Sequence, residues 1–210
     1  MINIIVADDH PLIRQGLRKV ATATGEIAVG DEASTSAELI NKLRKNPYDV
    51  VVLDISMPGK SGLEVIKEIK QEFPKAAVLV LSGYPEEQYA LRALRSGASG
   101  YLTKETAVNE LIGAVKKVAS GGKYVSASMA EELAFAVQDD SDRALHEKLS
   151  NREYQVMCMI ASGKTLKEVA EELFLSVKTV GTHRSRILTK MNMKNNAELI
   201  YYAVKNGLVE

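Results

Sequence analysis

The sequence has no tryptophan, one cysteine and no long hydrophobic run. Because Cys158 is the only cysteine, no disulfide can form within one chain. No apolar stretch approaches the roughly 20 residues that a helix needs to cross a bilayer. The first residues, Met1–Val6, carry no basic side chain and run directly into acids, which is unlike a signal peptide. We therefore expect a cytoplasmic protein with no membrane partner.

The chain as a whole also has no excess of positive or negative charge, because 27 basic residues balance 27 acidic ones. The balance hides an uneven distribution, since residues 173–209 carry six basic side chains and one acid, Glu198. Such a concentration indicates a surface that faces a polyanion. Charge alone does not separate a nucleic-acid site from a solvated helix, so both interpretations stay open at this point.

Residues 1–120 alternate between short β-branched runs and stretches with helical spacing. The runs predict strands at Ile2–Ala7, Ile27–Val29, Val50–Leu53, Val78–Leu81 and Gly100–Leu102. Apolar residues with helical spacing mark five helices between and after them, with Leu12, Leu17 and Val20 in the first and Leu91 and Leu94 in the fourth. Strands that alternate with helices are typical of an α/β doubly wound fold, a five-stranded parallel sheet covered on both faces.

The strand pattern ends before the C-terminal third of the chain. There we expect helices at Asn151–Ala161, Leu166–Leu173, Val177–Met191 and Asn196–Asn206. Residues 121–145 are rich in Ala, Ser, Asp and Glu, with helical spacing over Met129–Val137 and no apolar anchor in Gln138–Asp142. The sequence thus predicts an α/β domain over 1–120, a linker over 121–145 and a small all-α four-helix domain over 146–210.

Acidic residues stand at the ends of two predicted strands. Asp8 and Asp9 follow the first strand and Asp54 follows the third. In a flavodoxin-like sheet these strands are neighbours, and ligands bind beyond their carboxyl ends. Three close carboxylates repel one another, and Mg²⁺ relieves this repulsion because it prefers oxygen ligands. We therefore expect a magnesium ion held by the acids, with one carboxylate able to attack a phosphoryl group.

Each acid also has a simple structural interpretation. Asp9 could cap a helix that begins at Pro11, and Asp54 could open a turn. Ser82 and Lys104 favour a site instead, because a hydroxyl and an ammonium after the fourth and fifth strands could hold phosphoryl oxygens. A phosphohydrolase with Asp54 as nucleophile is the alternative. It is disfavoured because Asp54 is followed by Ile55-Ser56, with no second acid nearby in the sequence to protonate a leaving group.

Residues 1–120 resemble the receiver domain of two-component response regulators. The matching residues are Asp8-Asp9, the block from Asp54 to Gly59 with Gly62, Ser82, and Tyr101 three residues before Lys104. The resemblance implies that Asp54 accepts a phosphoryl group from a sensor histidine kinase, without turnover of an external substrate. It also implies that Asp8, Asp9, Asp54 and the carbonyl of Ser56 hold Mg²⁺. Ser82 and Lys104 would contact the phosphoryl group, and Tyr101 would change rotamer as a switch.

The helix predicted from Val177 follows a short helix across the turn Phe174-Leu175-Ser176, which suits docking in a DNA major groove. One face is apolar and another carries polar and basic groups. Lys178, Arg184, Arg186 and Lys190 would mostly meet phosphates, and Thr182 and Ser185 could approach base edges. The pattern alone equally permits a helical hairpin that packs on another protein.

Residues 146–209 closely resemble LuxR-type helix-turn-helix domains. The segments that carry the likeness are Leu149–Glu153, Ile160–Thr165 and Ser176–Val180, together with His183. With the receiver, this resembles the NarL/FixJ class, in which phosphorylation controls sequence-specific binding to double-stranded DNA and transcription. It implies that the helix from Val177 recognises DNA, so Thr179 and His183 join the expected contacts. The last helix would support a homodimer when phosphorylated, with RNA polymerase a further candidate partner.

We hypothesise that the unphosphorylated receiver occludes the recognition helix and that phosphorylation frees it. Two alternatives are a receiver that is a constitutive dimerisation module and a basic domain that binds protein instead of DNA. Gly181 departs from the lysine common in the family, which bears on the operator sequence more than on DNA binding itself. Asn195-Asn196 replaces a commonly basic pair, which we expect to soften one phosphate contact. His10 is expected to need no catalytic role, and Cys158 to pack in a core.

Overall fold

The computed structural model describes residues 1–23, 25–57, 60–127, 129–131 and 144–209. The chain divides into two compact units, Met1–Ala130 and Glu131–Glu210, and each is described by itself. Pro58, Gly59, the Gln138–Asp142 stretch and most of the helix predicted over Met129–Val137 lie outside the described residues. Among the described residues, no helix has the length and apolar character that a membrane span requires.

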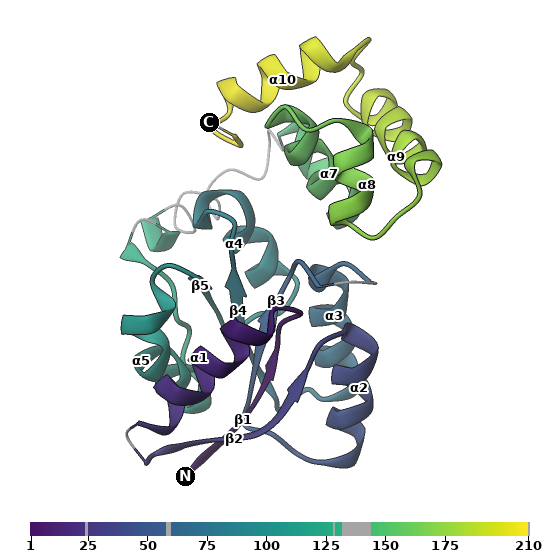
Figure 1. The fold of residues 1–210 in the computed structure, drawn as a ribbon. Coiled ribbons are helices and arrows are strands. Elements are labelled where there is room, and N and C mark those ends of the chain that lie inside the picture. Colours follow the sequence, from purple (N-terminus) through teal and green to yellow (C-terminus); the bar gives the residue numbers. More distant parts are fainter. Residues whose placement is uncertain (24, 58–59, 128, 132–143, 210) are drawn as a thin grey trace. The chain divides into compact units, whose positions relative to one another are not determined.

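The N-terminal unit is a five-stranded parallel sheet with helices on both faces (Figure 1). Its strands are β1 (Ile2–Ala7), β2 (Ile27–Ala33), β3 (Val50–Asp54), β4 (Ala77–Ser82) and β5 (Gly100–Thr103). Its helices are α1 (Pro11–Thr22), α2 (Ser36–Lys45), α3 (Gly62–Glu72), α4 (Glu86–Arg95) and α5 (Ala107–Ala119). The strand order β2-β1-β3-β4-β5 confirms the predicted flavodoxin-like fold and makes β1 and β3 neighbours.

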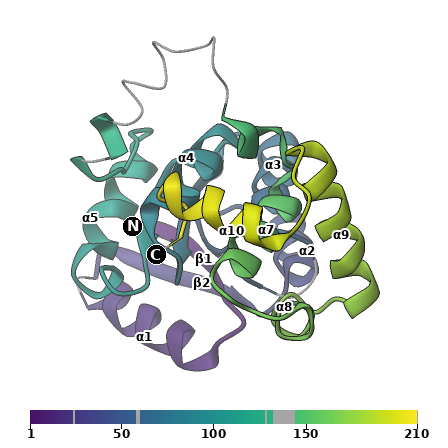
Figure 2. The ribbon, with the colours of Figure 1, turned by 90° about the horizontal axis from the view of Figure 1, so that it is seen from above.

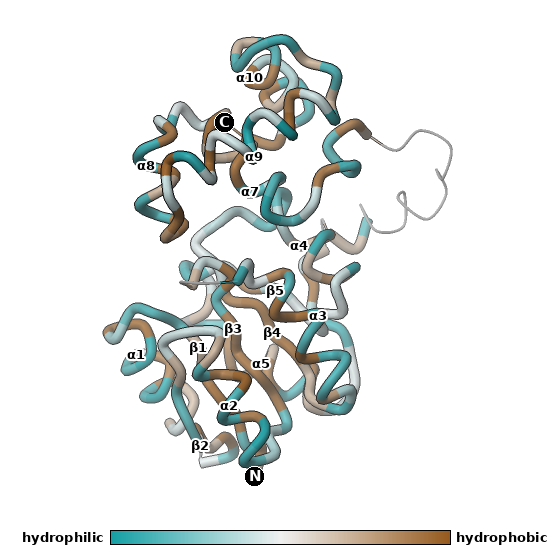
Figure 3. Tube along the Cα trace, turned by 90° about the vertical axis from the view of Figure 1, so that its right-hand side faces the viewer, coloured by the Kyte–Doolittle hydropathy of each residue, from teal (hydrophilic) through white to brown (hydrophobic). Residues whose placement is uncertain are grey.

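The core of this unit lies along the central strands, which are strongly hydrophobic in Figure 3. Every residue of β3 and β4 is buried, as a parallel strand covered on both faces requires. On one face, Leu17 and Ala21 of α1 and Leu111 and Val115 of α5 share a core cluster with strand residues. The sheet therefore presents its polar residues at strand ends, where Asp54 closes β3.

Three details differ from the sequence prediction. Strand β2 continues past Val29 to Ala33, because β2 is an edge strand that tolerates polar residues. Leu12 is 81 % exposed and does not share the buried face of α1, since five residues of helix turn it well away from Leu17. In α4, Leu91 and Leu94 are only partly buried. That helix instead buries Tyr89, Ala90 and Ala93.

The first residues after α5, which the sequence assigned to a linker, belong to the N-terminal unit. Tyr124 forms a parallel bridge with Gly100 at the edge of β5. The Tyr124 amide donates to the carbonyl of Ser99 at 2.9 Å, and its carbonyl accepts from the Tyr101 amide at 3.2 Å. Gly100 is needed here because a Cβ would lie 2.7 Å from the Tyr124 carbonyl oxygen. This edge segment, residues 122–126, covers part of the open side of β5.

The C-terminal unit is helical, as predicted. It contains the short 3₁₀ helix η1 (Leu145–Lys148) and helices α7 (Asn151–Ala161), α8 (Leu166–Glu172), α9 (Val177–Lys190) and α10 (Asn196–Lys205). Helix α7 packs against α9 and α10, and α8 packs against α9 (Figure 2). Each helix from α7 on begins at a side-chain cap, which satisfies a backbone N–H that has no partner in the helix. The caps are Ser150, Thr165, Ser176 and Asn195.

Candidate functional site

The predicted acids converge at the carboxyl ends of β1 and β3. Asp8 and Asp54 are each only 1 % exposed, and Asp9 is partly buried beside them. Together with His10 they form a group whose potential ligand atoms lie within 4.8 Å of one another. The neighbouring strands thus bring together carboxylates that are far apart in the sequence.

Lys104, in the loop after β5, joins two of these acids. Its ammonium lies 2.7 Å from Asp54 Oδ2 and 2.7 Å from Asp8 Oδ2. Its amide donates to the carbonyl of Ser82 at 2.7 Å, which ties its loop to the end of β4. Burial opposes the charge on Lys104, but the carboxylates of Asp54 and Asp8 outweigh this and raise its pKa.

Asp54 itself is held in an unfavourable place for a charge. Burial raises the pKa of Asp54, and nearby Asp8 adds to the rise, while Lys104 and the Ser56 amide lower it without cancelling the effect. That amide donates to Asp54 Oδ1 at 2.8 Å. The predicted role of the Ser56 carbonyl stays a prediction.

The donor set fits a hard divalent cation. Lys104 is the one lysine that pairs with these acids among the described residues, and it contacts Asp54 and Asp8, so the three carboxylates outnumber the ammonium. Asp8 Oδ2 and Asp9 Oδ1 are buried and make no hydrogen bond within the described part of the chain, although each meets an ion-pair partner. Buried oxygens of this kind are the ligands that Mg²⁺ prefers.

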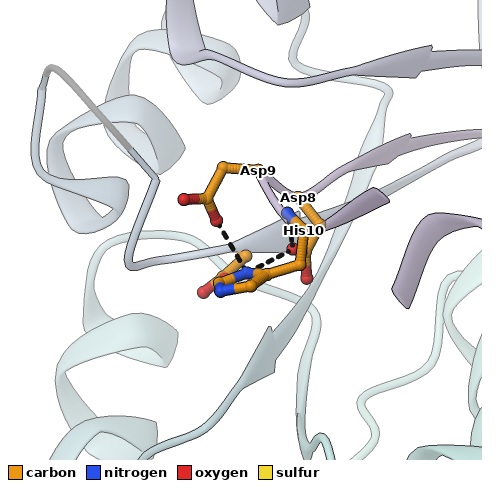
Figure 4. Close-up of side chains that lie close together, drawn as sticks. Asp8, Asp9 and His10 are labelled. Atoms are coloured by element: carbon orange, nitrogen blue, oxygen red, sulfur yellow. Dashed lines mark hydrogen bonds and ion pairs between the residues drawn. The ribbon is translucent and has the colours of Figure 1, made fainter. Parts of the chain in front are cut away.

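The sequence placed His10 in the loop beside the acidic pocket without a catalytic role, and the structure shows that its ring contacts the acids. Figure 4 shows its ring beside both acids, with Nδ1 2.9 Å from Asp9 Oδ1 and 3.0 Å from Asp8 Oδ1. Its amide also donates to Asp8 Oδ1 at 2.8 Å. Its position directly after the acid pair was the available indication, because Pro11 begins α1 and the chain must turn between the two.

The other predicted pocket residues, Ser82 and Tyr101, each form a hydrogen bond with the backbone of Tyr84. Ser82 is fully buried, and its Oγ accepts from the Tyr84 amide at 3.0 Å. Tyr101 is 2 % exposed and donates from its Oη to the Tyr84 carbonyl at 2.9 Å. Burial raises the pKa of Tyr101, so its hydroxyl stays protonated. The hydroxyl and the aromatic ring are therefore linked through one short loop after β4.

Gly62 closes the loop that follows Asp54. Its amide donates to the Ile55 carbonyl at 3.3 Å. A Cβ at this position would lie 2.3 Å from the Cα of Ile55, a distance that no side chain can tolerate. Close approach of the two backbones explains why glycine is needed here and fixes the loop beside the acids.

Helix α9 divides into faces as the sequence predicted. Its apolar stripe is buried and comprises Val180 and Ile187, with Met191 just beyond the helix end. The predicted DNA contacts Lys178, Thr179, Thr182, Ser185, Arg186 and Lys190 are exposed. His183 and Arg184 are partly buried. The exposed face therefore presents hydroxyls and cations together.

Two of the predicted cations have partners inside the protein. The Arg184 Nε donates to Asn196 Oδ1 at 2.6 Å, which joins α9 to α10. Lys190 Nζ donates to Glu153 Oε2 at 2.6 Å, which joins α9 to α7. The Glu153 side chain is only 4 % exposed. Burial works to raise its pKa, but Lys190 and Ser150 outweigh burial and the pKa is lowered. The Lys190 contact weighs against its predicted role at a DNA phosphate.

Helix α10 carries three exposed large apolar side chains. Ile200 is 37 % exposed, Tyr201 70 % and Val204 53 %, and all three share one side of the helix.

Comparison with known proteins matches both units. Residues 4–116 match the family model described as response regulator receiver domain. Residues 147–203 match the model described as bacterial regulatory proteins, luxR family. Response regulator UvrY of Escherichia coli strain K12 is 34 % identical over 209 residues, covering 99 % of this chain and 96 % of that protein. Oxygen regulatory protein NreC of Staphylococcus carnosus is 35 % identical over 216 residues, covering 100 % of each.

Solved structures of the RcsB response regulator from Salmonella typhimurium are also similar. One has a TM-score of 0.63 and 29 % identity, covering 97 % of this chain and 100 % of that one. A second, bound to promoter rprA in the presence of the phosphomimetic BeF3-, has a TM-score of 0.65 and 28 % identity, covering 96 % and 97 %.

Proposed function

Since the chain belongs to the response regulators that join a receiver domain to a LuxR-type DNA-binding domain, we propose that phosphorylation of Asp54 controls its binding to DNA. The family makes it a DNA-binding transcription regulator under two-component control. The finer proposal concerns which residues carry the phosphoryl group, the metal and the DNA. Receiver chemistry is assigned to residues 1–120 and DNA binding to residues 146–210.

The position of Asp54 is the observation that carries the proposal. It is the only residue at the end of β3 that is buried, acidic and in contact with Lys104. Its raised pKa reflects the burial of the carboxylate, and a carboxylate of this kind can act as the nucleophile in phosphoryl transfer. Asp8 and Asp9 would complete a site for Mg²⁺ with Asp54 and the Ser56 carbonyl.

In the proposed reaction an Asp54 carboxylate oxygen attacks phosphorus and forms a new O–P bond. The P–N bond to a histidine of a sensor kinase breaks, and the imidazole leaves with the electron pair. Bound Mg²⁺ would supply charge neutralisation for the phosphoryl oxygens. Lys104 already touches Asp54, and its ammonium would pair with a phosphoryl oxygen. No external substrate is turned over, because the acceptor is the protein itself.

The switch would begin at Ser82 and Lys104. A phosphoryl dianion on Asp54 offers both groups a stronger acceptor than they have in this structure. Ser82 accepts from the Tyr84 amide, so a shift of its hydroxyl would disturb the loop to which Tyr101 is also bound. Tyr101 would then change rotamer and alter the surface around α4 and β5.

DNA binding is assigned to the exposed face of α9. Lys178 and Arg186 would meet phosphates, and Thr179, Thr182 and Ser185 could approach base edges. The apolar patch of α10 supports a homodimer in the phosphorylated state. Double-stranded DNA, a sensor histidine kinase and RNA polymerase are the proposed partners.

Intact-mass analysis after incubation with Mg²⁺ and acetyl phosphate tests the acceptor. We expect one phosphoryl adduct on the wild-type chain and none on Asp54→Asn or in a Mg²⁺-free sample. Asp49→Asn, which changes an exposed aspartate near the start of the same strand, is the matched control and should still be labelled. An adduct on Asp54→Asn would refute the assignment.

Fluorescence anisotropy tests the control of DNA binding. A duplex enriched from a random pool by the phosphorylated protein serves as the probe. Phosphorylated wild type should bind it more tightly than unphosphorylated wild type, and Asp54→Asn should not respond to the phosphodonor. Equal affinities with and without phosphorylation would instead favour a receiver that only holds the dimer together.

A further inference from the structure

We propose that His10 is an additional metal ligand and that it makes the acidic pocket favour first-row transition metals more than three carboxylates alone would. This rests on the proposed function, because it concerns the same cation site. The carboxylate donors make the pocket suitable for Mg²⁺, and His10 is the one nitrogen donor of this metal-ligand group.

The spacing of the donor atoms carries the proposal. Adjacent ligands of an octahedral ion with bonds of about 2.1 Å stand about 3.0 Å apart. The His10 Nδ1 lies 2.9 Å from Asp9 Oδ1 and 3.0 Å from Asp8 Oδ1 (Figure 4). The His10 nitrogen thus stands from each of the two carboxylate oxygens at the separation of neighbouring ligands on one ion. Asp54 adds a fourth donor within the same 4.8 Å group.

The local backbone holds the imidazole in this place. The His10 amide donates to Asp8 Oδ1 at 2.8 Å, so the turn after β1 is closed by the same carboxylate. The residue after His10 is Pro11, which begins helix α1 and so limits how the backbone can turn at His10. The His10 side chain is 63 % exposed, so an ion can reach the ring from solvent.

Transition metals and Mg²⁺ differ in the donor atoms that they prefer. Imidazole suits Zn²⁺, Cu²⁺, Ni²⁺ and Fe²⁺, whereas Mg²⁺ keeps to carboxylate, carbonyl and water oxygens. With a transition metal, His10 would give its nitrogen to the ion in place of its contacts with Asp8 and Asp9. With Mg²⁺ those contacts compete with the ion for the same oxygens. Removal of His10 should therefore weaken the binding of transition metals and leave the binding of Mg²⁺ unchanged or stronger.

Isothermal titration of the full chain with Ni²⁺ and with Mg²⁺ tests this inference, using wild type and His10→Asn. We expect Ni²⁺ affinity to fall about tenfold or more, since even outer partners of metal ligands contribute about 10- to 100-fold. Mg²⁺ affinity should stay equal or rise. His183→Asn removes a histidine of the other unit and is the matched control for adventitious Ni²⁺ binding. Equal losses for both metals, or an unchanged Ni²⁺ affinity, would overturn the proposal.

A spectroscopic readout identifies the ligand directly. Electron paramagnetic resonance of the chain loaded with one Cu²⁺ should show nitrogen hyperfine coupling in wild type and in His183→Asn, and lose it in His10→Asn. A coupling that survives in His10→Asn would show that the nitrogen comes from elsewhere and refute the assignment. Labelling of the wild-type chain by acetyl phosphate with Mg²⁺ tests the proposed function separately, because it does not depend on which metal His10 prefers.

Discussion

Replacement of Lys190 separates a lysine that touches DNA from one that positions the recognition helix. The structure pairs its ammonium with Glu153 at 2.6 Å, and the Glu153 side chain is only 4 % exposed. Lys190→Met keeps most of the apolar stem but removes the charge. Breaking a fully buried pair costs about 3–5 kcal/mol. Lys190 is 42 % exposed and Glu153 keeps its bond from the Ser150 amide, so we expect a loss of about 1–2 kcal/mol.

This loss should appear in the thermal unfolding of the C-terminal unit. One kcal/mol lowers the melting temperature of a domain of this size by about 4–8 °C. The decisive quantity is the salt dependence of DNA affinity, measured by anisotropy between about 50 and 200 mM salt at a temperature where the variants are folded. Each phosphate contact contributes about 0.9 to the slope of log affinity against log salt.

Lys178→Met is the matched comparison, because Lys178 is exposed on the same helix and has no ion pair among the described residues. We expect Lys178→Met to reduce the slope by about 0.9. Lys190→Met should weaken binding while leaving the slope unchanged, since the Glu153 carboxylate already neutralises its charge. A slope that falls as much in Lys190→Met as in Lys178→Met would refute this reasoning and restore Lys190 as a phosphate contact.

Three further predictions concern the N-terminal unit. Asp54→Asn should raise the free energy of unfolding in urea at pH 7.5 without divalent cations, because the folded-state pKa of Asp54 lies above its ordinary value of 3.8. The cost of its charge is present above the folded pKa, so the gain should vanish as the pH falls toward 3.8. Gly62→Ala should cost about 3 kcal/mol or more, through its clash with Ile55, whereas Gly83→Ala has open space and should cost little in a thermal melt. Lys42 and the Ser34 amide lower the pKa of Glu38 from 4.5 to about 2. Glu38→Gln should therefore cost about 1 kcal/mol at pH 7, after allowance for its 38 % exposure, and the cost should disappear on acidification from pH 4.5 toward 2.

The sequence predicted much of the fold because the strongest patterns come from burial. The β-branched runs of β3 and β4 are buried along their whole length, and such strands leave an unbroken apolar pattern. The edge strand β2 does not, since its second half includes Asp31 and Glu32. The prediction of which helix residues face the core was wrong where apolar residues were sparse. In α1 the exposed Leu12 looks apolar in sequence, and only packing decides that it faces away from the core.

The candidate site was predictable to the level of residue types and strand ends. Topology brings Asp8 and Asp54 together, and the sequence pattern determines that topology. The hydrogen-bond and ion-pair partners of these side chains could not be predicted from the sequence pattern, because they depend on how a side chain reaches from one helix or strand to another. The sequence gives no indication that Lys190 meets Glu153 or that Arg184 meets Asn196. His10 was likewise set aside, since its part in the pocket depends on the turn that carries its ring over the acids.

The edge segment after α5 bears on where the N-terminal unit can be cut. The bridge between Gly100 and Tyr124 covers hydrogen-bonding groups of β5 that would otherwise face solvent. A fragment that ends at residue 120 exposes this edge, and an open strand edge invites pairing between copies. We expect such a fragment to aggregate in light scattering, and a fragment ending at residue 130 to stay monodisperse. The edge segment therefore prevents a strand of another chain from pairing with the edge of β5.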